Sequence, residues 1–151
     1  MYPYCSFSGA FGLDCPPHWA SYNTSCYRVI SHTRIVPAKT WEEARVNCLG
    51  FGGDLVSINS ASESIFIRNQ LKNERRGALW IGLYRNETSN PKQGWVWVDG
   101  TKLEYSRWKL GEPNNYDGNE KCGEIYTRDG LWNDGNCANS MPSICERKKG
   151  K

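Results

Sequence analysis

The 151-residue chain lacks any apolar run approaching the ~20 residues that cross a bilayer, so its sequence predicts no membrane span. Its start also lacks the charged segment and following apolar segment of a signal peptide, as expected of a mature or truncated product. The formal net charge is only +3, and no basic stripe interleaved with aromatic residues is present to follow a phosphate backbone. We therefore expect no nucleic-acid partner.

Signatures of catalysis are missing too. The two histidines, His18 and His32, are isolated, with no HExxH pair and no triad arrangement around them. No glycine-rich phosphate loop is present, and no nucleophile is placed beside a base. The sequence therefore predicts that the protein is not an enzyme.

Cysteine is abundant, but no two cysteines form a CxxC pair of the kind that binds zinc or performs redox chemistry. Dispersed cysteines are typical of disulfides and indicate a secreted protein or the extracellular portion of a membrane protein. Two glycosylation sequons, at Asn23 and Asn86, agree with export. The odd number leaves Cys5 as a candidate for a disulfide-linked homodimer, or as a free terminal thiol. The seven cysteines are Cys5, Cys15, Cys26, Cys48, Cys122, Cys137 and Cys145.

Two stretches carry helix signals. Thr40 and Glu43 form a capping box before apolar residues at helical spacing, and Gly50 can end this helix. Ser60 and Glu63 form a second box at the start of another predicted helix. The apolar positions are Trp41, Ala44 and Cys48 in the first helix and Ile67 and Leu71 in the second.

Short apolar or alternating runs follow, and they predict strands of a mostly antiparallel sheet. Two stretches without an apolar period, 85–94 and 109–121, are long enough to be functional or disordered loops. The strand-like runs are ALWIGL at 78–83, GWVWVDG at 94–100, CGEIYT at 122–127 and MPSICE at 141–146.

Three motifs, WIGL at 80–83, EPN at 112–114 and WND at 132–134, occur in this order together with the two helices and the cysteine spacing. In this combination the chain resembles the C-type lectin family. The resemblance implies an α+β, C-type lectin-like fold that is stapled by disulfides. In that fold, two helices flank small antiparallel sheets and a long calcium-binding loop region.

The resemblance covers nearly the whole chain and implies a lectin domain at 15–146. An N-terminal segment at 1–14 with the unpaired Cys5 precedes it, and a basic tail at 147–151, expected to be solvated, follows it. The disulfides implied by the resemblance are Cys15–Cys26, Cys48–Cys145 and Cys122–Cys137.

Five side chains around the EPN and WND motifs offer only oxygen ligands: Glu112, Asn114, Glu120, Asn133 and Asp134. Such a set suits a hard cation with ~6–8 oxygen ligands and suits zinc or copper poorly, so the expected metal is Ca²⁺. The resemblance adds the backbone carbonyl of Asp134 as a ligand and implies a cis peptide bond before Pro113. Since Lys121 stands where relatives with an additional calcium carry an acid, we expect one principal site.

In lectins of this pattern the same side chains hold calcium and hydrogen-bond two neighbouring sugar hydroxyls. The Glu-Pro-Asn order is similar to that of the mannose, fucose and N-acetylglucosamine class, so glycoconjugates of this class are the expected ligands. Tyr116 offers a ring that can pack on galactose, which is the alternative specificity, or that covers its own loop. The sugar contacts implied by the resemblance are Glu112, Asn114, Glu120 and Asn133, with Tyr116 as a candidate.

Other members of the same fold bind proteins, ice or minerals, and these alternatives stay open because fold does not fix function. Trp80, Trp95 and Trp97 are predicted to fill the core rather than to stack on glycans, because large aromatic residues usually do so.

Overall fold

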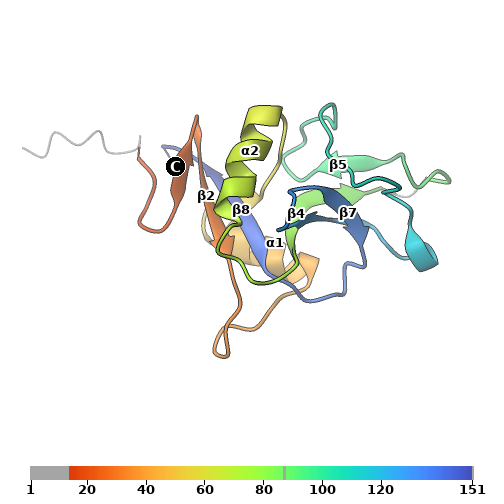
Figure 1. The fold of residues 1–151 in the computed structure, drawn as a ribbon. Coiled ribbons are helices and arrows are strands. Elements are labelled where there is room, and N and C mark those ends of the chain that lie inside the picture. The colour runs from red at the N-terminus through yellow and green to blue at the C-terminus, as the bar shows by residue number, and fades with distance from the viewer. Residues whose placement is uncertain (1–13, 87, 151) are drawn as a thin grey trace, which may run out of the picture.

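The computed structural model describes residues 14–86 and 88–150, which form an eight-stranded sheet with two helices (Figure 1). The strands follow the order β1-β2-β8-β4-β6-β7, with β3 paired to β8 and β5 paired to β4. The strand pairs are antiparallel except β4 with β8, where Trp80 lies opposite Ser143, so the predicted α+β fold is confirmed. The strands are β1 (Ala20–Tyr22), β2 (Ser25–Ile30), β3 (Asp54–Leu55), β4 (Ala78–Arg85), β5 (Trp95–Trp97), β6 (Cys122–Tyr126), β7 (Trp132–Gly135) and β8 (Ser143–Lys148).

Strand β8 comes last in the chain but lies inside the sheet. It pairs with β2 on one side, and both β3 and β4 also pair with it. Cys145 on this strand is bonded to Cys48 of α1 (Trp41–Gly50), across a sequence separation of 97 residues. The bond fastens the first helix to the sheet and holds together segments that are distant in the sequence.

The basic tail expected at 147–151 includes two residues of the last strand. Arg147 and Lys148 belong to β8, where they lie opposite Cys26 and Ser25 of β2. The ammonium group of Lys148 donates to the Ser25 hydroxyl at 3.1 Å. The strand continues past Cys145 because the backbone of β2 still offers hydrogen-bond partners there.

Helix α1 begins with the predicted capping box. Thr40 Oγ1 accepts from the backbone N–H of Glu43, and Glu43 Oε2 accepts from the backbone N–H of Thr40. The helix ends at Gly50, as predicted, and Phe51 is its capping residue. The left-handed conformation that glycine favours falls instead on Gly52, with φ of 80°.

Helix α2 (Ala61–Gln70) also begins where its sequence predicts, with a modified box. Ser60 Oγ accepts from the backbone N–H of Glu63 at 3.1 Å. The Glu63 carboxylate, however, accepts from the backbone N–H of Asn59, at 3.2 Å. The carboxylate therefore satisfies the backbone N–H of Asn59, the residue before the N-cap, instead of the N–H of Ser60.

The core lies between the sheet and the helices and is rich in tryptophan. Trp80 is fully inaccessible, and Trp95 and Trp97 are nearly so, which confirms their assignment to the core. Trp132 is fully inaccessible as well. Cys15 and Cys26 are bonded at the N-terminal hairpin, as the resemblance implied. Cys5 lies outside the described residues. Within 14–86 and 88–150, neither helix has the length and apolar character needed to cross a membrane.

Candidate metal and ligand site

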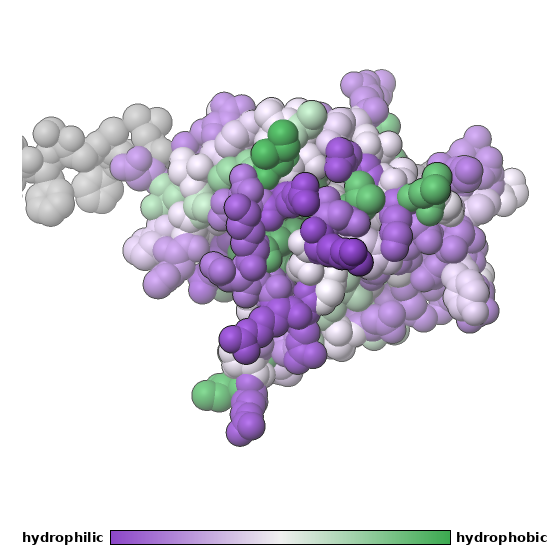
Figure 2. Space-filling view, in the orientation of Figure 1, coloured by the Kyte–Doolittle hydropathy of each residue, from purple (hydrophilic) through white to green (hydrophobic). Residues whose placement is uncertain are grey.

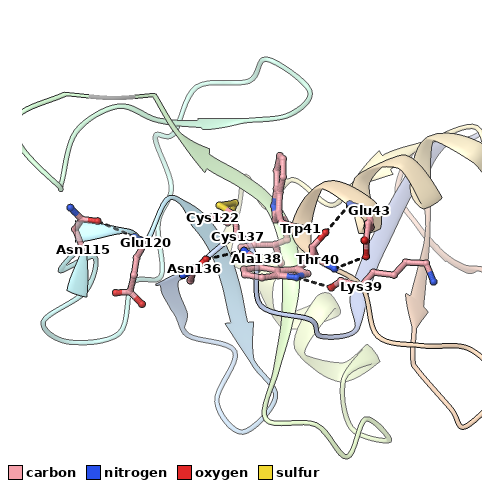
Figure 3. The surroundings of a disulfide bond; sticks show 12 residues. Lys39, Thr40, Trp41, Glu43, Asn115, Glu120, Cys122, Asn136, Cys137 and Ala138 are labelled. Atoms are coloured by element: carbon pink, nitrogen blue, oxygen red, sulfur yellow. Dashed lines mark hydrogen bonds between the residues drawn. A yellow bond between two sulfur atoms is a disulfide. The ribbon is translucent and has the colours of Figure 1, made fainter. Parts of the chain in front are cut away.

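The predicted ligands gather at one end of the β6–β7 hairpin. Asn133 and Asp134 of β7 lie opposite Glu124 and Gly123 of β6. The Cys122–Cys137 disulfide joins the start of β6 to the segment after β7, and loop 109–121 enters β6 beside it (Figure 3). The loop and β7 together therefore supply all five candidate ligands.

Asp134 holds the EPN segment against β7. Its side chain is fully buried, and its two oxygens accept from the backbone N–H groups of Asn114 at 3.2 Å and Asn115 at 2.6 Å. The peptide bond between Glu112 and Pro113 is cis, the geometry that the resemblance implied. One carboxylate thus fixes two consecutive residues of the loop.

Glu120 and Asn114 are brought together through the backbone of Tyr116. The Tyr116 N–H donates to Asn114 Oδ1 at 3.1 Å and to Glu120 Oε1 at 2.8 Å. In return, Asn115 Oδ1 accepts from the backbone N–H of Glu120 at 3.0 Å, a bond drawn in Figure 3. Asn115 has a φ of 50°, a left-handed conformation that asparagine tolerates better than most residues. The loop therefore turns so that two ligand side chains, Asn114 and Glu120, share one hydrogen-bond donor, the backbone N–H of Tyr116.

Asn133 is positioned by a residue that the sequence reasoning missed. Its Nδ2 donates to Oε1 of Glu124 at 2.9 Å, and Glu124 is buried in β6. Because one end of a side-chain amide donates and the other accepts, this bond turns the carbonyl of Asn133 away from Glu124. The signal that could have identified Glu124 was a carboxylate inside the apolar strand pattern of CGEIY.

The carboxylates of the site are close enough to affect one another. Burial, followed by the hydrogen bond and charge of Asp134 and the charge of Glu120, raises the pKa of Glu112 to about 7. Burial also raises the pKa of Glu120, and the neighbouring charge of Asp134 acts in the same direction. In the ionised form of Glu112, Oε2 is buried and, within the described chain, meets no hydrogen-bond donor.

The donor set fits a hard divalent cation. It contains three carboxylates and two amides, and the orphaned oxygen of Glu112 gains a partner when a cation binds. Within 14–86 and 88–150, no three or more His, Cys, Asp or Glu side chains are grouped to hold a metal by themselves. The candidate ligand set differs from such a group because two of its five members are amides. In addition, both oxygens of Asp134 accept from backbone N–H groups.

A second loop segment, residues 88–94, is held by a cationic side chain of the same chain. Arg85 is 8% exposed, and its guanidinium donates to the carbonyls of Thr88 at 2.7 Å, Asn90 at 2.8 Å and Gln93 at 3.0 Å. The sequence predicts a long loop here but carries no signal that Arg85 organises it.

Two apolar side chains are exposed beside the site. Tyr116 is 70% exposed, so its ring does not cover its own loop, and Leu110 is 99% exposed. Leu110 was not singled out from the sequence, where nothing distinguishes it from a core leucine.

Comparison with known proteins matches residues 37–147 to the family model described as the Lectin C-type domain. The human C-type mannose receptor 2 is 38% identical over 136 residues, which span 89% of this chain and 9% of that protein. The cow CD23 carbohydrate-recognition domain, solved in the presence of a GlcNAc2Man3 oligosaccharide, is 31% identical with a TM-score of 0.77, covering 89% of this chain and 96% of that chain. A calcium-independent type II antifreeze protein is 29% identical with a TM-score of 0.76, covering 93% and 99%.

Proposed function

Because this chain belongs to the C-type lectin domain family, we propose that it binds carbohydrate through one calcium ion at the end of the β6–β7 hairpin. The family is one of carbohydrate-binding domains rather than enzymes. The residues that would hold the ion are Glu112, Asn114, Glu120, Asn133 and Asp134.

The observation that carries this proposal is the junction between the EPN segment and Asp134. Two backbone N–H groups of the loop bond to the buried Asp134 carboxylate, while one buried oxygen of Glu112 lacks any partner among the described residues. An unpaired buried carboxylate oxygen is unfavourable unless a donor or a cation completes it. The site therefore offers oxygen ligands and a negative charge that its own residues do not neutralise.

When bound, Ca²⁺ supplies coordination positions for two neighbouring hydroxyls of a sugar ring. The carboxylates of Glu112 and Glu120 accept hydrogen bonds from these hydroxyls. The amides of Asn114 and Asn133 donate to the hydroxyl oxygens, and the Asn133 amide keeps a second N–H after bonding to Glu124. Each hydroxyl thus meets an acceptor on one side and a donor on the other.

We favour mannose, fucose and N-acetylglucosamine as the sugar class. The Glu-Pro-Asn order supports this choice, as do the printed names of two relatives, a mannose receptor and a domain solved with a mannose-containing oligosaccharide. Galactose binding remains the alternative, and the exposed ring of Tyr116 is the observation that favours it.

The test is a glycan array in calcium, repeated with chelator and with competing mannose or galactose. We expect calcium-dependent binding that mannose inhibits, and we expect Glu112→Gln with Asn114→Asp to shift inhibition toward galactose because acceptor and donor exchange places. Inhibition of the unmodified protein by galactose would replace the mannose assignment. Absence of any calcium-dependent signal would overturn the lectin proposal, and thermal hysteresis would then test ice binding.

Three disulfides favour an extracellular location, because such bonds persist in oxidising compartments. A further bond through Cys5 between two chains would present two sugar sites and raise avidity by ~10²–10⁴ where geometry permits. Non-reducing electrophoresis of the protein beside a Cys5→Ser variant tests this, and identical monomer bands would refute it.

A further inference from the structure

A shallow, basic groove lies between α2 and the turn that joins β6 to β7. Its volume is about 470 Å³, and three of its lining side chains are cations whereas none is an acid. In Figure 2, which has the orientation of Figure 1, the surface over α2 is mixed, with an apolar side chain on the helix and strongly hydrophilic side chains below it. The groove is lined by Ile65, Arg68, Asn69, Lys72, Thr127 and Arg128.

Ion pairs that would neutralise the positive charge of this groove are absent from the part of the chain that the structure describes. Within the described residues, no carboxylate forms an ion pair with Arg68, Lys72 or Arg128. The adjacent Asp129 uses Oδ1 to accept from the backbone N–H of Leu131 at 3.0 Å. An exposed cluster of cations without partners attracts anions.

One of the three cations, Arg68, packs against the turn between β6 and β7. Arg68 lies in the last turn of α2, and Lys72 follows directly after Leu71, the capping residue of that helix. The aliphatic stem of Arg68 lies against Gly130, where an added Cβ would come within 3.4 Å of it. Thr127 donates to the carbonyl of Arg76 at 3.0 Å, which ties the β6–β7 turn to the segment after α2.

The groove lies along the same hairpin as the sugar site. From Gly123, opposite Asp134, to Thr127 the strand rises about 13 Å, at ~3.3 Å per residue. Lys109 stands between the two places: its carbonyl accepts from the backbone N–H of Glu112, and its ammonium group lies 5.1 Å from the ring of Tyr126. A bound chain a few sugar units long can therefore span both.

We propose that the groove of Arg68, Lys72 and Arg128 is a second subsite, which binds sulfate or carboxylate groups of an anionic glycan whose neutral terminal sugar occupies the calcium site. This rests on the proposed function. The acidic calcium site repels anions, so the anionic groups of such a ligand bind some distance away from it. The groove has no aromatic side chain for base stacking, which distinguishes it from a site for single-stranded nucleic acid.

The experiment compares neutral mannan with chemically sulfated mannan in calcium at low salt. We expect sulfated mannan to bind the unmodified protein about tenfold more tightly, with the advantage lost at high salt. A variant with Arg68→Gln, Lys72→Gln and Arg128→Gln keeps its affinity for neutral mannan and loses the tenfold gain. The matched control, with Arg34→Gln, Lys102→Gln and Lys149→Gln, has the same net charge and retains the gain.

The outcomes separate the two proposals. If neutral mannan fails to bind the unmodified protein in calcium, the proposed function is wrong. If neutral mannan binds but sulfation gives no gain, or if both triple variants lose the gain equally, the subsite is refuted. If the full gain persists in chelator, the groove binds polyanions independently of the sugar site, and the extended-ligand proposal is overturned.

Discussion

The two long loops of this protein are held around charges of opposite sign. Residues 88–94 wrap around the buried guanidinium of Arg85, which donates to three of their carbonyls. Residues 109–121 are fixed instead by the carboxylate of Asp134, which accepts from two of their backbone N–H groups. Between residues 109 and 121, Pro113 is the only buried residue, so apolar packing contributes little to this loop.

The difference explains why only one of the loops is a candidate for ligand binding. The guanidinium of Arg85 is paired within its own chain, because its Nε and Nη2 donors meet the backbone carbonyls of Thr88, Asn90 and Gln93. The carboxylates around loop 109–121 outnumber the groups that satisfy them, since Glu112 keeps a buried oxygen without a partner in the described structure. The first loop is therefore expected to be insensitive to calcium, and the second to depend on it.

Replacing Arg85 by Met is expected to have the largest effect and to be independent of calcium. The substitution keeps most of the apolar stem but removes the donors to Thr88, Asn90 and Gln93, at a cost of about 3 kcal/mol in the free energy of unfolding. Denaturant unfolding with calcium and with chelator measures it, with the exposed Arg34→Met as control. An equal stability of Arg85→Met and Arg34→Met would show that the guanidinium does not organise the loop.

Replacing Asp134 by Asn is expected to act on the other loop and to abolish the calcium response. The amide presents N–H donors toward the N–H groups of Asn114 or Asn115, so the EPN segment loses its anchor. Calcium-dependent sugar binding should fall at least about 100-fold, or ~2.7 kcal/mol, to the level of the unmodified protein in chelator. The control is Glu42→Gln on the exposed face of α1. Retained binding by Asp134→Asn would exclude it as a ligand.

Local sequence patterns predict part of this structure, whereas contacts that form only in the folded chain are not predicted. Capping boxes and tryptophan-rich strand patterns are local, and they predicted α1, α2 and the core. The meeting of the EPN and WND motifs at one site was implied instead by the family resemblance. Arg85 and Glu124 were missed because their roles depend on partners that meet them only in the folded chain. The register that sets Glu124 opposite Asn133 is a product of strand pairing, and no spacing along the sequence encodes it.

Replacing Glu124 by Ala should weaken calcium binding by about tenfold, the range usual for residues that orient a metal ligand. Loss of the acceptor frees the amide of Asn133 to rotate, although the ligand itself remains. Glu124→Gln keeps an oxygen that can accept from Asn133 and should bind calcium close to the unmodified affinity. Titration calorimetry with calcium checks the ranking. Equal losses in both variants would point to the charge of Glu124 instead of its hydrogen bond.

The pH dependence of stability should have opposite signs with and without calcium. In chelator, the raised pKa of Glu112, about 7 against an ordinary 4.5, means that the folded state binds a proton that the unfolded state has lost. This contribution is fully present below pH 4.5 and disappears as the pH rises through 7, on the order of 1 kcal/mol after allowance for solvent screening. In calcium, stability should instead increase with pH, because the ligands must be deprotonated to coordinate the ion.

Glu112→Gln tests this sign reversal, because it removes the titrating carboxyl and keeps the size of the side chain. Burial also raises the pKa of Glu63, Glu124 and Glu146, so part of the decline in chelator must persist in the variant. The quantity to measure is therefore the difference between the urea-unfolding profiles of the two proteins from pH 4.5 to 7.5. A flatter profile for the variant assigns the missing slope to the unpaired Glu112 carboxylate, and identical profiles would show that loop 109–121 is as complete without a cation as the Arg85 loop.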